Sequence, residues 1–268
     1  MKNDSHVHSP YCPHGSGDSF EEYIEQAITL EMEELTFTEH APLPDGFIDP
    51  TPDRDSGMER GQLLDYFQEL ALLKERYKEK ITIKTGLEVD YIEGFEAETK
   101  SFLNQFGKYL DDSILSVHFI RHENEWHCID FSDEMFKSIA NKLGSVDAVY
   151  SSYFDTLENS IAADLGDFKP KRIGHITLVH KFQQRFLPKK NYDQKLYSIL
   201  DKMNKQGYEL DYNGAGAIKP LCLEPYPPER FVKYALHLGI PVRYGSDAHQ
   251  ASDLGQGYDT CLAEAFTK

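Results

Sequence analysis

The chain has 268 residues, and its 45 Asp and Glu outnumber its 28 Lys and Arg, which gives a formal net charge of −17. This excess repels nucleic acid and anionic lipid, so we expect neither as a partner. No run approaches the roughly 20 apolar residues of a membrane helix, and the N-terminus lacks the apolar stretch of a secretory signal. The four cysteines are far apart and form no C-x-x-C pair, which indicates reduced thiols. We therefore expect a cytoplasmic globular protein.

Short apolar strands alternate with amphipathic helices along the chain. A capping box of Ser19 and Glu22 predicts the start of one helix, and a longer helix is predicted from about Glu59 to Tyr77. The apolar runs predict seven strands, near Val7 and over residues 34–40, 81–87, 114–117, 172–175, 208–212 and 241–244. Seven strand and helix units in one run indicate parallel strands with crossover helices, in a barrel-like or doubly wound α/β fold.

The Pro-, Asp- and Gly-rich stretch 41–57 is too long for a plain turn. Because it follows a histidine at a strand end, we interpret it as an active-site loop rather than a domain boundary. Its four aspartates would make an anionic rim for a cationic substrate, although a charged loop is more often only solvated surface. They are Asp45, Asp49, Asp53 and Asp55.

Histidines and carboxylates occupy the carboxyl ends of the predicted strands. In a barrel these ends converge on one face, so residues 240 positions apart can meet in one cleft. His6 and His8 point to the same side of an extended strand and can bind one metal, although such a pair often occurs by chance. Carboxylates beside imidazoles suit hard or borderline divalent ions. The strand-end residues are His6, His8, His40, Glu88, His118, His175, Asp247 and His249, with His14 six residues after His8.

Four further histidines have weaker claims to a site. His122, His127, His180 and His237 are interpreted as surface or packing residues, and His237 lies within a helical run. His180 competes with His175 for one position, but only His175 directly follows a predicted strand end.

The order of these motifs resembles that of the PHP (polymerase and histidinol phosphatase) family, over residues 6–249. Within the family the sequence is most similar to the histidinol-phosphatase branch. The resemblance rests on the N-terminal H-x-H, His14, Thr38-Glu-His40-Ala-Pro-Leu-Pro44, Gly86-Leu-Glu-Val-Asp-Tyr91, Ser116-Val-His-Phe119, Gly174-His175 and Gly245-Ser-Asp-Ala-His249.

The resemblance implies a single domain over residues 1–268, folded as a distorted (β/α)7 TIM-like barrel with three divalent ions of Zn, Mn or Fe. It places His6, His8, Glu88 and Asp247 on the first ion. Glu88, bridging, with His118 and His175 would bind the second, and His14, His40 and His249 the third. No cysteine belongs to this set. The ligands alone would carry about −2, so three divalent ions would bring the pocket to about +4.

The implied activity is a metal-dependent phosphomonoesterase of histidine biosynthesis that hydrolyses L-histidinol phosphate through a metal-bridging hydroxide. A PHP-type phosphoesterase for another small phosphate ester, phosphotyrosine or a nucleotide, is the alternative. A non-catalytic metal-binding protein fits less well, because structural zinc sites are rich in cysteine. The oligomeric state leaves no signal in the sequence.

Glu88, Asp247 and His249 are predicted to be catalytic. By likeness, Asp247 and His249 are candidates to protonate the leaving group, with Asp90 or a bound water as alternatives. Arg185 and Arg243 are candidate phosphate contacts, because a guanidinium binds oxyanions in a fork, and Asn213 is a candidate to orient substrate. For either arginine alone, surface solvation is the more common role, and Asn213 could instead hold a turn.

Overall fold

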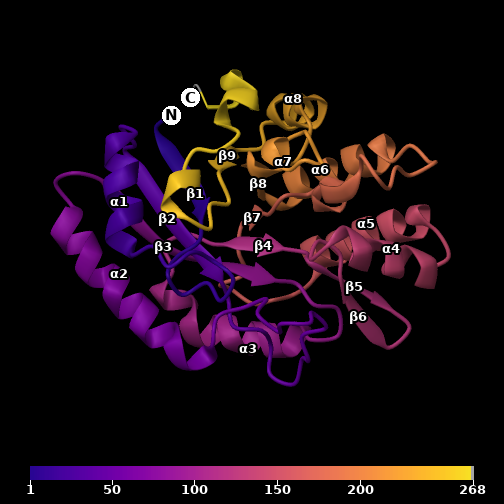
Figure 1. The fold of residues 1–268 in the computed structure, drawn as a ribbon, viewed down its shortest axis with the longest axis horizontal. Helices are drawn as coiled ribbons and strands as arrows, with labels where there is room; N and C mark the ends of the chain where they lie inside the picture. Colours follow the sequence, from indigo (N-terminus) through magenta and orange to yellow (C-terminus); the bar gives the residue numbers. More distant parts are fainter. Residues whose placement is uncertain (267–268) are drawn as a thin grey trace.

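The computed structural model describes residues 1–266, and its centre is a barrel-like sheet of parallel strands (Figure 1). Each strand lies parallel to its neighbours, and the strands follow one another around the sheet in chain order. Within the described chain, the strands of this sheet are β1 (Asn3–Val7), β2 (Glu34–His40), β3 (Thr82–Asp90), β4 (Ile114–Ser116), β7 (Arg172–Ile173), β8 (Glu209–Asn213) and β9 (Val242–Gly245). All seven strands predicted from the sequence are confirmed.

The sheet closes almost completely, because the chain that leaves β9 returns to β1. Val7 forms a parallel bridge with Ala248. The amide of His8 donates to the Ala248 carbonyl (2.9 Å), and the amide of Asp247 donates to the His6 carbonyl (2.7 Å). The predicted distorted (β/α)7 barrel is thus confirmed, and the contacts that close it between β9 and β1 involve residues of the candidate site.

Helices lie on the outside of the strands (Figure 1). Those that the structure describes are α1 (Phe20–Thr29), α2 (Leu63–Tyr77), α3 (Glu96–Phe106), α4 (Asp133–Lys142), α5 (Val146–Ala162), α6 (Asp193–Gln206), α7 (Ala215–Ile218) and α8 (Glu229–Leu238). The capping box at α1 is confirmed: the Ser19 hydroxyl accepts from the Glu22 amide, and the Glu22 carboxylate accepts from the Ser19 amide. The second predicted helix begins with a 3₁₀ turn at Arg60–Gln62 and continues as α2.

An antiparallel hairpin after β4 was not predicted. It consists of β5 (Phe119–His122) and β6 (Glu125–Cys128), two four-residue strands joined by a polar turn in which Glu123 has φ 55°. A turn that places glutamate rather than glycine in the left-handed region gives no sequence signal. Phe47 packs against Phe119 and Trp126, with ring centroids 5.1 and 5.8 Å apart. The hairpin therefore holds the 41–57 loop beside the barrel.

The apolar core fills the barrel and the space between strands and helices. Phe37, Leu115, Ile173 and Leu210, from four strands, are fully buried within it. Burial on both faces is typical of parallel strands covered by helices. Across residues 1–266 no helix combines the length and apolar character needed to cross a bilayer.

Candidate metal centre

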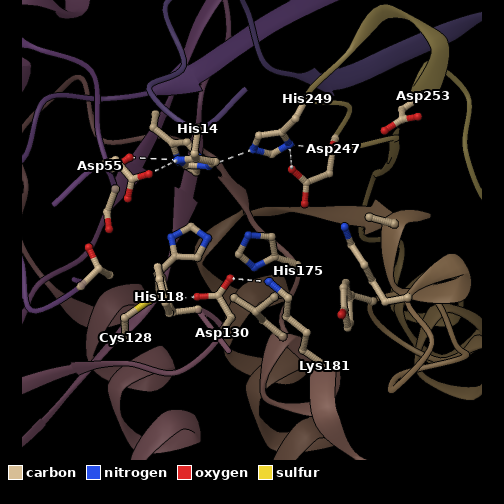
Figure 2. A pocket seen from close by; sticks show the side chains of 18 of the residues that line it. His14, Asp55, His118, Cys128, Asp130, His175, Lys181, Asp247, His249 and Asp253 are labelled. Atoms are coloured by element: carbon tan, nitrogen blue, oxygen red, sulfur yellow. Dashed lines mark hydrogen bonds and ion pairs between the residues drawn. The ribbon is translucent and has the colours of Figure 1, made fainter. Parts of the chain in front are cut away.

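The carboxyl ends of the strands bring the nine predicted ligands together at one end of the barrel. A cavity of about 410 Å³ opens there, and six of the nine line it: His14, His40, His118, His175, Asp247 and His249 (Figure 2). The other three, His6, His8 and Glu88, are buried. The arrangement leaves a buried cluster of donors with one open side.

A first group of donor atoms comes from His6, His8 and Asp247. Asp247 Oδ1 lies 3.1 Å from His8 Nε2 and 3.6 Å from His6 Nε2. The Asp247 backbone has φ 55°, a left-handed conformation that is uncommon for residues other than glycine and is frequent at functional sites. The hydrogen bond from its backbone amide to the His6 carbonyl holds this conformation and points the carboxylate at both imidazoles.

A second group comes from Glu88, His118 and His175. Glu88 Oε1 lies 2.9 Å from His175 Nε2 and 3.7 Å from His118 Nε2. The other oxygen, Oε2, lies 3.4 Å from His6 Nε2 and 3.2 Å from His40 Nδ1. The two carboxylate oxygens of Glu88 therefore face two different sets of histidines, which is the geometry of a bridging ligand.

A third group lies nearest the cavity mouth. His14 Nε2 and His249 Nε2 face each other at 3.3 Å (Figure 2). His40 and His249 also form a group with His8 and the thiol of Cys12, in which one donor atom from each residue lies within 4.8 Å of the others. Sequence reasoning missed Cys12, because cysteines were judged by their spacing from other cysteines.

Three carboxylates behind the ligands fix the orientation of the imidazoles. Such partners set the tautomer, so that Nε2 presents its lone pair to a cation. The pairs are His6 Nδ1 with Asp211 (3.0 Å), His8 Nδ1 with Glu39 (3.3 Å) and His118 Nδ1 with Asp90 (2.8 Å). Gly245 makes room for the first pair, because a Cβ there would collide with His6 Cβ and approach Asp211 Oδ1 to 2.8 Å.

The buried carboxylates of the cluster are ionised only because positive charge lies beside them. Burial opposes ionisation of Glu88, but His6 and His118 outweigh it and hold the pKa of this carboxyl well below its usual range. Burial likewise disfavours charge on His6, yet the carboxylates of Asp211 and Glu88 raise the pKa of this imidazole to about 10. In the metal-free protein, protons on the imidazoles balance the negative charge of the carboxylates, which bound cations would balance instead.

The formal charge differs from the sequence estimate. Three carboxylates that are not ligands, Glu39, Asp90 and Asp211, lie against the ligand imidazoles. Together with Glu88 and Asp247 they give about −5 within the described residues, so three divalent ions would leave about +1 rather than about +4. The ions alone would therefore attract a phosphate less strongly than the ligand count suggests.

The donor atoms fit divalent cations. His6 Nε2, His40 Nδ1 and Glu88 Oε2 are buried without a hydrogen-bond partner in the described chain, although they converge on one another. A buried polar atom without a partner costs about 1–3 kcal/mol. Metal ions held by these imidazole and carboxylate donors would satisfy all three atoms, and such mixed ligands suit Zn, Mn or Fe.

The structure does not bring the two predicted arginines to the cavity. Arg185 is an exposed residue paired with Asp133 and Glu134, and Arg243 is paired with Glu209 at 3.1 Å. Neither residue lines the cavity. Arg243 precedes the carboxyl end of β9 by two residues, so its side chain does not reach the site.

Asn213 supports a ligand instead of lining the cavity. Its side-chain amide donates to Asp247 Oδ2 (3.1 Å), and its carbonyl oxygen accepts from the Ala215 amide (3.0 Å). His180, the rival of His175, pairs with Glu224 (2.8 Å) and stacks on Tyr150.

Lys181 and Asp130 line the cavity and were missed by sequence reasoning. Lys181 Nζ donates to Asp130 Oδ2 at 3.0 Å (Figure 2). Burial disfavours the charged forms of both groups. Even so, the Lys181 ammonium keeps the pKa of Asp130 well below its usual range, and Asp130 keeps the pKa of Lys181 above its usual value. The pair therefore supplies a fixed ammonium beside the donor cluster.

The sequence also matches a family model. The model named PHP domain matches residues 4–215, which is more than half of the chain. The chain belongs to the PHP domain family. The family predicted from the motifs is therefore confirmed.

Relatives of this PHP protein cover its whole length. It is 45% identical over 264 residues to the histidinol-phosphatase of Bacillus subtilis (strain 168), with 98% of each chain covered. Among solved structures, the crystal structure of HisK from Listeria monocytogenes superposes with a TM-score of 0.91 at 40% identity, covering 97% of this chain and 99% of that one.

A more distant solved structure shares the fold. It is the histidinol phosphate phosphatase of Lactococcus lactis subsp. lactis Il1403, complexed with zinc, L-histidinol and phosphate. It superposes with a TM-score of 0.72 at 21% identity, covering 100% of this chain and 94% of that one.

Proposed function

We propose that this PHP protein is a histidinol-phosphatase, which hydrolyses L-histidinol phosphate to L-histidinol and phosphate with divalent metal ions. The 45% identity to the Bacillus subtilis histidinol-phosphatase, over 98% of both chains, supports the substrate. The reaction class rests on Glu88, whose two carboxylate oxygens face separate groups of histidines beneath an open cavity. Two ions bridged in this way suit displacement at phosphorus.

The proposed ligands follow the three groups of donor atoms. His6, His8, Glu88 and Asp247 would hold the first ion, Glu88, His118 and His175 the second, and His14, His40 and His249 the third. When bound, such ions supply Lewis-acid charge to phosphate oxygens and lower the pKa of coordinated water toward neutrality. Glu88, Asp247 and His249 thus take part in the reaction as ligands.

Asp247 is suited to metal binding and not to proton donation. His8 lies beside Oδ1 at 3.1 Å, and the Asn213 amide donates to Oδ2 at 3.1 Å. Burial raises the pKa of this carboxyl, but the His6 and His8 imidazoles outweigh burial and hold it well below its usual range. An acid that stays ionised in this way has no proton to give to a leaving alkoxide.

Lys181 is the proposed phosphate contact. The ligand cluster and its three supporting carboxylates retain only about +1 with three divalent ions bound, so a phosphate dianion gains from one more cation. The Lys181 ammonium lines the cavity, and its bond to Asp130 leaves two N–H donors for phosphate oxygens. Asp130 acts as a positioning residue that keeps Lys181 charged.

Acidic residues at the cavity suit the cationic part of L-histidinol phosphate. Asp55 and Asp253 line the cavity on either side of the facing His14 and His249 (Figure 2). Asp49, in contrast, accepts hydrogen bonds from Thr51 and Ser56 and so stabilises the 41–57 loop itself. We assign the substrate ammonium to the part of the cavity that Asp55 and Asp253 line.

The test is a panel of phosphate monoesters assayed on protein with quantified metal. Phosphate release from L-histidinol phosphate should exceed release from phosphotyrosine and nucleotide monophosphates by at least about 100-fold in kcat/KM, because phosphotyrosine has no imidazole and the nucleotides have no ammonium. Equal rates across the panel would favour the alternative of a phosphoesterase for another ester.

A further inference from the structure

The Cys12 thiol lies in the third donor group. A turn after β1 places it there: the Cys12 amide donates to the Ser9 carbonyl (3.0 Å), and the Gly15 amide donates to the Cys12 carbonyl (3.2 Å). The side chain is 6% exposed. Its sulfur is within 4.8 Å of ring nitrogens of His40 and His249, a spacing at which one ion can contact all three donors.

The facing imidazoles of this group need a proton or a metal ion between them. His14 Nδ1 donates to the Asp55 carbonyl (2.9 Å), and His249 Nδ1 donates to the Asp247 carbonyl (3.0 Å). A carbonyl only accepts, so both Nδ1 atoms carry hydrogen and, in the neutral rings, both Nε2 atoms carry lone pairs. These lone pairs face each other at 3.3 Å, which is unfavourable unless one ring gains a proton and donates it to the other, or a metal ion lies between them.

His40 gives an independent indication of a ligand. It is 8% exposed, and one of its ring nitrogens belongs to the Cys12 group. Its Nδ1 makes no hydrogen bond within the described chain and lies 3.2 Å from Glu88 Oε2. His8 belongs to the same group, but its Nε2 faces Asp247 and its Nδ1 faces Glu39. If His8 binds the first ion, the donors left for a third ion are the Cys12 thiol and the imidazoles of His14, His40 and His249.

We propose that Cys12 binds the third metal ion as a thiolate, together with His14, His40 and His249. The inference deepens the proposed metal centre and rests on it. On binding, the S–H bond breaks, a sulfur–metal bond forms and the proton leaves to solvent, so the sulfur adds one negative charge to the site. One sulfur and three nitrogens form a four-coordinate set of the type that zinc prefers.

A thiolate ligand makes the third site selective. Sulfur and imidazole donors favour Zn²⁺, Co²⁺ or Fe²⁺, whereas Mn²⁺ and Mg²⁺ prefer oxygen ligands. The first two sites mix imidazole with carboxylate donors, so their preference for these ions is weaker. We therefore assign the third site to a borderline-soft ion even where manganese occupies the other two.

The experiment is cobalt substitution of the whole protein, read by absorption without turnover. Wild-type protein loaded with Co²⁺ should show a thiolate-to-cobalt charge-transfer band in the near ultraviolet, and Cys12→Ser should lose the band while keeping the visible bands of cobalt on the other ligands. Cys128→Ser is the matched control. Cys128 lines the same cavity, but its thiol donates a hydrogen bond to Asp130 (3.3 Å), and among residues 1–266 it belongs to no group of metal-binding donors with histidines.

A wild-type protein that binds three cobalt ions without the band would overturn the proposal, as would a band that survives Cys12→Ser. If Cys12→Ser does not fold, alkylation of the metal-stripped wild type decides. Zn²⁺ but not Mg²⁺ should protect Cys12 from iodoacetamide, and equal labelling with and without Zn²⁺ would refute the assignment. Both readouts are independent of hydrolysis, so a failure of the proposed substrate would leave the band unchanged.

Discussion

Replacing Lys181 by methionine tests whether the structure has identified the phosphate contact. Methionine keeps most of the side-chain volume and removes the ammonium that lines the cavity. Lys181 belongs to the 3₁₀ segment Leu178–Phe182, which follows β7, and its Nζ lies 3.0 Å from Asp130 Oδ2. The substitution therefore removes a cation from the cavity without deleting a proposed metal ligand.

The expected loss follows from one charge-assisted hydrogen bond. Such a bond contributes about 1.5–3 kcal/mol, and the 26% exposure of the Lys181 side chain favours a value near 2 kcal/mol. At 1.36 kcal/mol per tenfold change, kcat/KM for L-histidinol phosphate should fall roughly 30-fold. The single variant also leaves Asp130 unpaired, so Lys181→Met with Asp130→Asn should lose similar activity with better thermal stability.

Steady-state phosphate release with quantified metal is the assay, and Arg185→Met is the matched control. Arg185 is an exposed cation paired with Asp133, so its removal should change kcat/KM by less than about twofold. Equal losses in both variants would show that general electrostatic attraction, and not a positioned ammonium, explains the effect. Full activity of Lys181→Met would refute the assignment outright.

Three further predictions follow from the ligand geometry and from one buried lysine. Glu88→Ala should lose two metal ions and nearly all turnover with its circular dichroism unchanged; unchanged metal content would show that Glu88 does not bridge. Asp211→Asn should weaken metal binding about 10–100-fold in chelator competition, because His6 loses its orienting carboxylate, and unchanged affinity would contradict that role. Lys169 Nζ donates to three carbonyls at the end of α5 at 2.7–2.8 Å, so Lys169→Met should lower the free energy of unfolding by about 2–3 kcal/mol. Exposed Lys137→Met is its control, and equal denaturation midpoints would refute the capping role.

The barrel and its ligand positions could be predicted because both follow from local pattern. Alternating strands and helices specify the order of units, and the carboxyl ends of parallel strands share one edge. A histidine or carboxylate at a strand end is therefore placed near the others without knowledge of any contact. The family model matches residues 4–215, a range that contains seven of the nine positions.

The residues that support the ligands could not be predicted in this way. Asp211 and Asn213 lie on the same face of β8, yet only the structure shows that one supports His6 and the other Asp247. Lys181 and Asp130 meet across 51 residues of sequence through elements that carry no shared motif. The two arginines were predicted for their fork geometry, but pairing with Asp133 and Glu209 holds them outside the cavity.

The proposed function is tested most directly by the ratio of kcat/KM for L-histidinol phosphate to that for phosphotyrosine, measured on one metal-quantified preparation. We expect a ratio of at least about 100, with two or more bound divalent ions per chain and loss of activity on chelation that the metal restores. A ratio near one, or full activity with fewer than two ions per chain, would contradict the account.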